Sequence, residues 1–402
     1  MRGRAALVGL LLVAGCSGAD GDGRGDGTDT VDRPTVTVAP TSPPSVTDPG
    51  TTPDPPQTTG SLAPPTPLVQ SLPAAPCELG AVPADGEVTF VAGSKLYGVR
   101  PDGTGGRCLT ELSEVPSGAV QWGPQGDRVL LGPSTVLDAS GTRASGFFAD
   151  NPAVRWSRPT GSALIAPRQN DGQLIWRESS DAAERLDISF LARTDSAVYH
   201  PAGRNILAAG VDAGGVYGVF LAGNRGEDAR PVATVADATT FVHDLAFDAG
   251  GTHAYFVHDH PSEYHVHDLA FPDLALTDLV VSPEPVGRLV VDGVASIAWR
   301  QGDCAGRTST VVWSPDSGPS RPVGAGSLLE IMSTEPVGWV GGGSLAVMAR
   351  ARGCDGPGDL WIVPAGSDPP VLVVSAIEQA AVRAVSATPV DLPGGINNQA
   401  PG

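Results

Sequence analysis

Histidine is the residue type with the clearest chemical potential in this chain. Six of the seven histidines fall between positions 243 and 267, and four of them flank a short polar segment. These four are His258, His260, His265 and His267. Neutral imidazole nitrogen is a common ligand of zinc, copper and nickel. The pattern therefore indicates a candidate site for one of these ions.

The four histidines share one face if they belong to a β-hairpin, because alternate residues of a strand point to the same side of the sheet. A turn at 261–264 sets His260 opposite His265 and His258 opposite His267, with opposed Cβ atoms about 4.5 to 5.5 Å apart. The prediction depends on register, since a slip of one residue moves a strand's side chains to the other face. A pH-sensitive surface patch and a solvated hairpin tip are the alternatives.

The elements around this hairpin are predicted to be short strands. From about Glu87, apolar runs alternate with Gly, Pro, Asp and Asn, and helical spacing is almost missing. An aromatic residue followed by a turn and a second apolar run recurs along the chain. The aromatic anchors are Trp122, Trp156, Tyr199, Phe247, Trp299 and Trp339. Their separation of roughly 34 to 52 residues fits four-stranded propeller blades.

Two of these units, 121–130 and 155–164, resemble the TolB-like, WD-repeat-like propeller blade, in which an aromatic precedes a Ser-Pro-Asp-Gly-like turn and a buried strand. The resemblance implies an all-β chain with a β-propeller over 77–388, of seven blades, with six or eight as alternatives. The segment 89–99 resembles the later half of a blade. We therefore expect a strand within 381–385 to complete it, so that no sheet edge stays open. The resemblance implies no particular activity.

The amino-terminal residues predict export and lipidation. Arg2 and Arg4 precede an apolar run, 5–14, that is too short to span a bilayer. The run ends in Val-Ala-Gly-Cys at 13–16, which resembles the bacterial lipobox. The resemblance implies cleavage after residue 15 and a diacylglycerol on the thiol of Cys16. An ordinary signal peptide, with an incidental Cys16, is the alternative.

Composition divides the rest of the chain. The segment 16–76 is rich in Pro, Thr, Ser, Gly and Asp, and it has too little apolar surface to offset the entropy of ordering. We expect a disordered tether there and a disordered tail at 389–402. The formal net charge of −19 argues against a nucleic-acid partner, because such a partner needs cationic side chains at its phosphates.

Four cysteines follow position 16, and an even number in an exported chain favours disulfides. Three pairings exist. We favour Cys77 with Cys108 and Cys304 with Cys354, because each bond then joins segments of the same or adjacent blades. The sequence contains no Cys-x-x-Cys spacing, the pattern that would suggest a zinc site.

Three functions are compatible with these features. We expect a non-enzymatic binding or scaffold module, held by its lipid on the extracytoplasmic face of the cell membrane, that meets an unknown protein, peptide or glycan partner. One alternative is a metal-binding or sensing lipoprotein that uses the histidine hairpin. The other is an enzyme with a central-channel site, such as a lactonase or lyase, although nothing in the sequence nominates the carboxylates that it needs. A serine peptidase is disfavoured, because no Gly-x-Ser-x-Gly elbow occurs.

Overall fold

A computed structural model of the chain describes residues 65–383 with gaps. The gaps are 74–76, 78–85, 114, 117–119, 124–127, 133–134, 139–142, 145–154, 157–163, 168–173, 178–182, 186–189, 235–240 and 294. The predicted signal at 1–15, the lipidation site Cys16 and the tail at 389–402 therefore lie outside the described residues.

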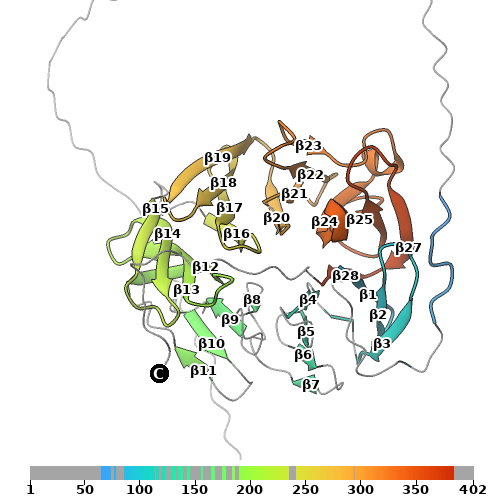
Figure 1. The fold of residues 1–402 in the computed structure, drawn as a ribbon, viewed down its shortest axis with the longest axis horizontal. Helices are drawn as coiled ribbons and strands as arrows, with labels where there is room; N and C mark the ends of the chain where they lie inside the picture. Colours follow the sequence, from blue (N-terminus) through green and yellow to red (C-terminus); the bar gives the residue numbers. More distant parts are fainter. Residues whose placement is uncertain are drawn as a thin grey trace, which may run out of the picture. The chain divides into compact units, whose positions relative to one another are not determined.

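The described strands form seven antiparallel sheets of four strands each. The sheets are arranged around a common centre, with one strand of each sheet innermost (Figure 1). This arrangement confirms the predicted β-propeller. Within the described part of the chain, no helix has the length and apolar character needed to cross a bilayer.

Each sheet is one blade, and its strands follow in order from the innermost to the outermost. Blade 1 consists of β28 (Gln379–Val382), β1 (Val88–Ala92), β2 (Lys95–Val99) and β3 (Arg107–Glu111), and blade 2 of β4 (Val120–Trp122), β5 (Arg128–Leu131), β6 (Thr135–Asp138) and β7 (Arg143–Ala144). Blade 3 consists of β8 (Arg155–Trp156), β9 (Leu164–Pro167), β10 (Leu174–Arg177) and β11 (Ala183–Arg185), and blade 4 of β12 (Leu191–Tyr199), β13 (Asn205–Asp212), β14 (Tyr217–Gly223) and β15 (Arg230–Thr234). Blade 5 consists of β16 (Phe241–Phe247), β17 (His253–Asp259), β18 (Tyr264–Ala270) and β19 (Ala275–Ser282). Blade 6 consists of β20 (Val286–Val291), β21 (Ile297–Gln301), β22 (Ser309–Trp313) and β23 (Arg321–Pro322). Blade 7 consists of β24 (Ser333–Val340), β25 (Ser344–Arg350), β26 (Gly358–Val363) and β27 (Val371–Ile377). Two 3-10 turns, η1 (Leu328–Glu330) and η2 (Gly341–Gly343), lie in blade 7 or just before it. The inner strands β12, β16, β20, β24 and β28 contact one another in succession.

The core lies between neighbouring blades rather than on one side of a single sheet. Phe256 packs towards blade 4 with Leu207 and Val219, whereas Tyr255, its neighbour in sequence, packs towards blade 6 with Trp299. Both faces of a middle strand are therefore buried. This explains why such strands appear in the sequence as continuous apolar runs without polar alternation.

The ring closes between the two ends of the folded region. β28 pairs with β1 in antiparallel register, with Val88 opposite Val382 and Phe90 opposite Ala380. A carboxy-terminal closing strand was therefore predicted correctly, but it spans Gln379–Val382 and begins before the expected 381–385. Pairing at this position removes the open edge that blade 1 would otherwise have.

Residues before the predicted domain start also pack on the propeller. The backbone N–H groups of Leu68 and Val69 donate to the carbonyls of Leu372 and Val373 on the outer strand β27, at 3.0 and 2.8 Å. The folded region thus begins before Cys77, and part of the segment predicted as a free tether covers a sheet edge.

The recurrent aromatics connect one blade to the preceding one. The indole N–H of Trp122 donates to Oγ1 of Thr89 in blade 1 at 2.7 Å, and that of Trp156 donates to the carbonyl of Gln121 in blade 2 at 3.1 Å. Trp339 reaches the carbonyl of Val290 in blade 6 at 3.4 Å. In these three units the repeated tryptophan is therefore an inter-blade contact, whereas the hydroxyl of Tyr199 donates to the carbonyl of Asn224 in its own blade at 3.2 Å.

Trp299 does not belong to this series. It lies on β21, the second strand of blade 6, with its side chain fully buried, and the inner strand of that blade is Val286–Val291. The turn after Val291 is the equivalent of the other units, since Asp292 accepts from the backbone N–H of Ser296. The long 52-residue interval before Trp299 arose because an anchor was assigned to the wrong strand.

Candidate metal centre

The histidine segment forms the predicted hairpin, but in a different register. β17 pairs with β18 so that His258 is opposite His265 and Phe256 is opposite His267. The turn spans 260–263, and the backbone N–H of His260 donates to the carbonyl of Glu263 at 2.8 Å. The predicted pairing of His258 with His267 was therefore wrong by two residues. Because two residues is a full period of a strand, the faces of the histidines are unchanged.

All four predicted side chains converge. The ring centroids of His258 and His260 are 4.0 Å apart, and those of His260 and His265 are 4.6 Å apart. His267 lies 5.6 Å from His265 and 5.8 Å from His258 between ring centroids. The hairpin therefore gathers four imidazoles at one end of blade 5.

The apolar pattern of blade 5 places these rings. His258 and His267 continue the face that carries Ala254, Phe256 and Leu269, which packs towards blade 4. The ring of Phe256 lies 4.8 Å from that of His267. The histidines thus occupy the end of a buried apolar face, and only about 1% of His258 and 7% of His267 is exposed.

Burial and like charge keep the two inner histidines neutral. Desolvation, reinforced by the neighbouring imidazoles, lowers the pKa of His258 to about 3. Desolvation also lowers the pKa of His267 to about 4, although Asp278 opposes the shift. Nε2 of each ring is buried and has no hydrogen-bond partner within the described part of the chain. Both residues therefore present neutral imidazole, the form that ligates metals.

A carboxylate that the sequence did not nominate completes the cluster. Asp278 on β19 places Oδ1 2.7 Å from Nδ1 of His267 and Oδ2 3.6 Å from Nδ1 of His265. One ligand atom from each of these three residues lies within 4.8 Å of the other two. A bulge between β18 and β19 sets Asp278 opposite His267. Only pairing with the next strand of the blade could have identified this residue.

We name the group formed by His258, His260, His265, His267 and Asp278 the histidine cluster. Its donors are imidazole nitrogen and a single carboxylate, a set that suits zinc, copper or nickel better than calcium or magnesium. The predicted ligands and the missed one together provide more donors than a four-coordinate ion requires.

The two remaining histidines of blade 5 are engaged elsewhere. His253 contacts Asp268 at 2.8 Å through Nδ1. His243 lies between two carboxylates, with Nδ1 2.9 Å from Asp244 and Nε2 2.9 Å from Asp259. Burial opposes protonation of His243, but the hydrogen bonds to the two carboxylates raise its pKa to about 9. Both rings are therefore engaged by carboxylates rather than open to a metal.

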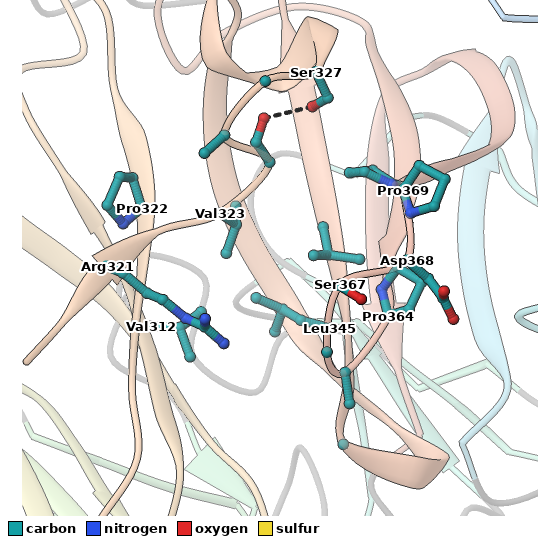
Figure 2. A pocket seen from close by; sticks show the side chains of 18 of the residues that line it. Val312, Arg321, Pro322, Val323, Ser327, Leu345, Pro364, Ser367, Asp368 and Pro369 are labelled. Atoms are coloured by element: carbon teal, nitrogen blue, oxygen red, sulfur yellow. Dashed lines mark hydrogen bonds between the residues drawn. The ribbon is translucent and has the colours of Figure 1, made fainter. Parts of the chain in front are cut away.

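A separate cavity of about 390 Å³ lies between blades 6 and 7. Figure 2 shows Leu345 and Val312 among its apolar side chains, with Arg321 and Asp368 on opposite walls. Ser327 donates to the carbonyl of Gly324 at 2.6 Å and holds one wall. No local sequence pattern indicates this cavity, because its walls come mainly from the loops after β23 and β26, which are far apart in the sequence.

Both predicted cysteine pairs are bonded. Cys77 joins Cys108 on β3, and Cys304 joins Cys354. The first bond attaches the segment before blade 1 to that blade. The second connects the loop after β21 in blade 6 with the loop after β25 in blade 7.

Comparison with known proteins agrees on fold and supplies no family. No family model matches the chain, and no curated protein matches it. Among solved structures, a prolyl endopeptidase is 12% identical with a TM-score of 0.50, over 75% of this chain and 50% of that one. A TolB protein from Agrobacterium tumefaciens is 10% identical with a TM-score of 0.42, over 75% of this chain and 98% of that one. TolB from Acinetobacter baumannii has the same identity and TM-score, over 75% and 67%.

These similarities concern architecture alone. The chain has a β-propeller fold, as the repeats indicated, and it spans half the length of the prolyl endopeptidase. At such identities the activities of these proteins are not transferred to this chain.

Proposed function

We propose that this protein is a non-enzymatic binding module: an extracytoplasmic β-propeller lipoprotein held at the cell membrane through Cys16, whose ligand is a transition-metal ion at the histidine cluster. The apolar run before the lipobox-like residues supports the anchor. The disulfides Cys77–Cys108 and Cys304–Cys354 support an oxidising compartment, where such bonds persist.

The observation that carries the ligand is the pair of buried, unpartnered nitrogens in the histidine cluster. Nε2 of His258 and Nε2 of His267 have no hydrogen bond to any residue that the structure describes, and such buried polar atoms cost about 1 to 3 kcal/mol each when unsatisfied. A bound cation would accept their lone pairs. The carboxylate of Asp278 beside His267 would offset part of the ion's charge.

Isothermal titration of the purified chain with ZnCl₂, CuCl₂ and NiCl₂ tests the metal. We expect one ion per chain with affinity at least in the micromolar range, and copper bound most tightly by the usual order of divalent stabilities. Saturation at 100 times the dissociation constant should raise the unfolding free energy by about 2.7 kcal/mol. No binding tighter than millimolar for all three ions would contradict the proposal.

Two substitutions locate the ion. His258→Ala and Asp278→Ala should each weaken binding, whereas His253→Ala, in the same blade but paired with Asp268, should leave affinity unchanged. Equal loss in the control variant would assign the binding to general destabilisation of blade 5.

The anchor is tested by fractionation of bacteria that express the full chain. Mass spectrometry should find an amino terminus at residue 16 that carries diacylglycerol, and the protein should partition into detergent. Cys16→Ala should move it to the aqueous phase. An unprocessed, unmodified amino terminus in the cytosolic fraction would refute the localisation.

A protein, peptide or glycan partner is also part of the proposal. The cavity between blades 6 and 7 supports it, because it combines an apolar wall at Leu345 with opposite charges at Arg321 and Asp368.

A further inference from the structure

Three arginines converge on one carboxylate at the inner side of blades 6 and 7. Nη1 of Arg350 lies 2.7 Å from Oε1 of Glu335, and both side chains are about 5% exposed. Nη1 of Arg288 and Nη1 of Arg300 lie 3.8 and 3.9 Å from Oε2 of the same carboxylate. We name Arg288, Arg300 and Arg350 the arginine cluster.

Glu335 cannot balance this cluster. Three guanidinium groups surround one carboxylate, which leaves two positive charges in excess. A further carboxylate lies beside the cluster: Oδ2 of Asp244 accepts from the backbone N–H of Arg288 at 2.6 Å. It is shared with His243, which a pKa near 9 keeps protonated and which also contacts Asp259. That group of three residues contributes one net negative charge, so a positive excess remains.

Donors of Arg300 are unused. Among the residues that the structure describes, its Nε is buried without a hydrogen-bond partner, and the hydrogen bond of its Nη1 goes to the sulfur of Cys354, a weak acceptor, at 3.4 Å. The distances from Arg288 and Arg300 to Glu335 exceed hydrogen-bond length. A guanidinium presents a planar fork that pairs with the two oxygens of a carboxylate or phosphate.

Solvent reaches the two underused arginines. The side chain of Arg288 is 30% exposed and that of Arg300 is 24% exposed, whereas Arg350 and Glu335 are buried beneath them. The backbone of Arg288 has a positive φ of 55° at a bulge in the inner strand β20. A positive φ is uncommon for a residue other than glycine. Here it accompanies the bulge that carries a charged residue on the innermost strand of the blade.

From these contacts we infer that Arg288 and Arg300 form a binding site for an oxyanion, a carboxylate or phosphate group of a small molecule. Glu335 and Arg350 are positioning residues: they lie buried beneath Arg288 and Arg300 and orient the two guanidinium groups. One positive charge remains in excess, and the two adjacent guanidinium groups can together bond the oxygens of one dianion. This site lies on other strands than the histidine cluster and does not depend on metal binding.

The test uses the full chain, freed of metal on a chelating resin, with inorganic phosphate and malonate as probes and chloride at matched ionic strength as the reference. Titration calorimetry and thermal shift should show binding of at least one dianion. Malonate alone would identify a carboxylate ligand, and phosphate alone a phosphorylated one. Equal stabilisation by all three salts, or none by either probe, would overturn the inference.

Substitutions assign the binding to the cluster. Arg288→Gln and Arg300→Gln should each lower affinity at least tenfold, and Arg288→Lys should fall between them and the unaltered protein because it retains charge without the fork. Arg307→Gln removes an exposed arginine from the loop after β21 of blade 6, outside both proposed sites, and should change nothing. Circular dichroism confirms that each variant is folded. Unchanged affinity in both cluster variants, or an equal loss in the control, would refute the site.

Discussion

The disulfide between Cys304 and Cys354 offers a quantitative test of how the last two blades are held together. It joins loops of blades 6 and 7, and both residues are only half-buried. Replacing both by serine removes the crosslink while leaving small polar groups that water can reach. Serine at 354 also keeps an acceptor near Nη1 of Arg300, which lies 3.4 Å from the sulfur.

The loop length sets the expected magnitude. The two cysteines are 50 residues apart in sequence, and chain entropy then gives about 4.1 kcal/mol at 25 °C. The same relation gives about 3.7 kcal/mol for Cys77 and Cys108, which are 31 apart. Each loss is a large part of the 5 to 15 kcal/mol typical of domain stability. The longer loop should contribute more by only about 0.4 kcal/mol, because the entropy grows with the logarithm of length.

Urea unfolding, followed by tryptophan fluorescence and circular dichroism, measures both values. Cys304→Ser/Cys354→Ser should lower the unfolding free energy by about 4 kcal/mol, and Cys77→Ser/Cys108→Ser should serve as the matched comparison. Reduction of the unaltered protein should produce a loss at least as large as either variant. A serine variant within about 1 kcal/mol of the oxidised protein would show that loop entropy does not control the stability of these blades.

Three further outcomes are expected. Trp122→Phe and Thr89→Val, combined in a double-mutant cycle of urea unfolding, should reveal a coupling of about 0.5 to 1.5 kcal/mol from the bond between blades, and strict additivity would argue against it. The pKa of His243 rises from an ordinary 6.5 to about 9 in the fold, so its contribution to stability should be complete below pH 6.5 and lost as pH rises through 9. In a pH series of urea unfolding midpoints, His243→Gln should remove the decrease in midpoint between these two pH values. An unchanged decrease would show that the ion pairs of His243 do not cause it. Gly210→Ala should lower the melting temperature of the protein strongly, because the added Cβ would overlap a carbonyl oxygen of β12. Gly106→Ala should leave the melting temperature unchanged, because the space around Gly106 is open. Equal melting temperatures of the two variants would refute the close contact at Gly210.

Local sequence features were sufficient for the architecture. The turn residues and the aromatic recurrence indicated short strands in propeller-like units, because several blades repeat the same inter-blade contact, such as the indole bond of Trp156. The amino-terminal half-blade predicted a closing strand, because an unpaired edge would remain without it. The anchor at Trp299 failed because a buried aromatic on a second strand has the same local pattern as one on a first strand.

The candidate sites show the limit of this reasoning. Alternation alone placed the four histidines on one face, and an even error in register left that result intact. Sequence by itself therefore determined which histidines could meet. Only the tertiary structure decided the rest: it supplied Asp278 through a bulge in the next strand, and it brought Arg288, Arg300 and Glu335 together from separate strands. Such contacts depend on how strands and blades pack against one another. The spacing of residues within one segment does not encode the distance between side chains on different strands.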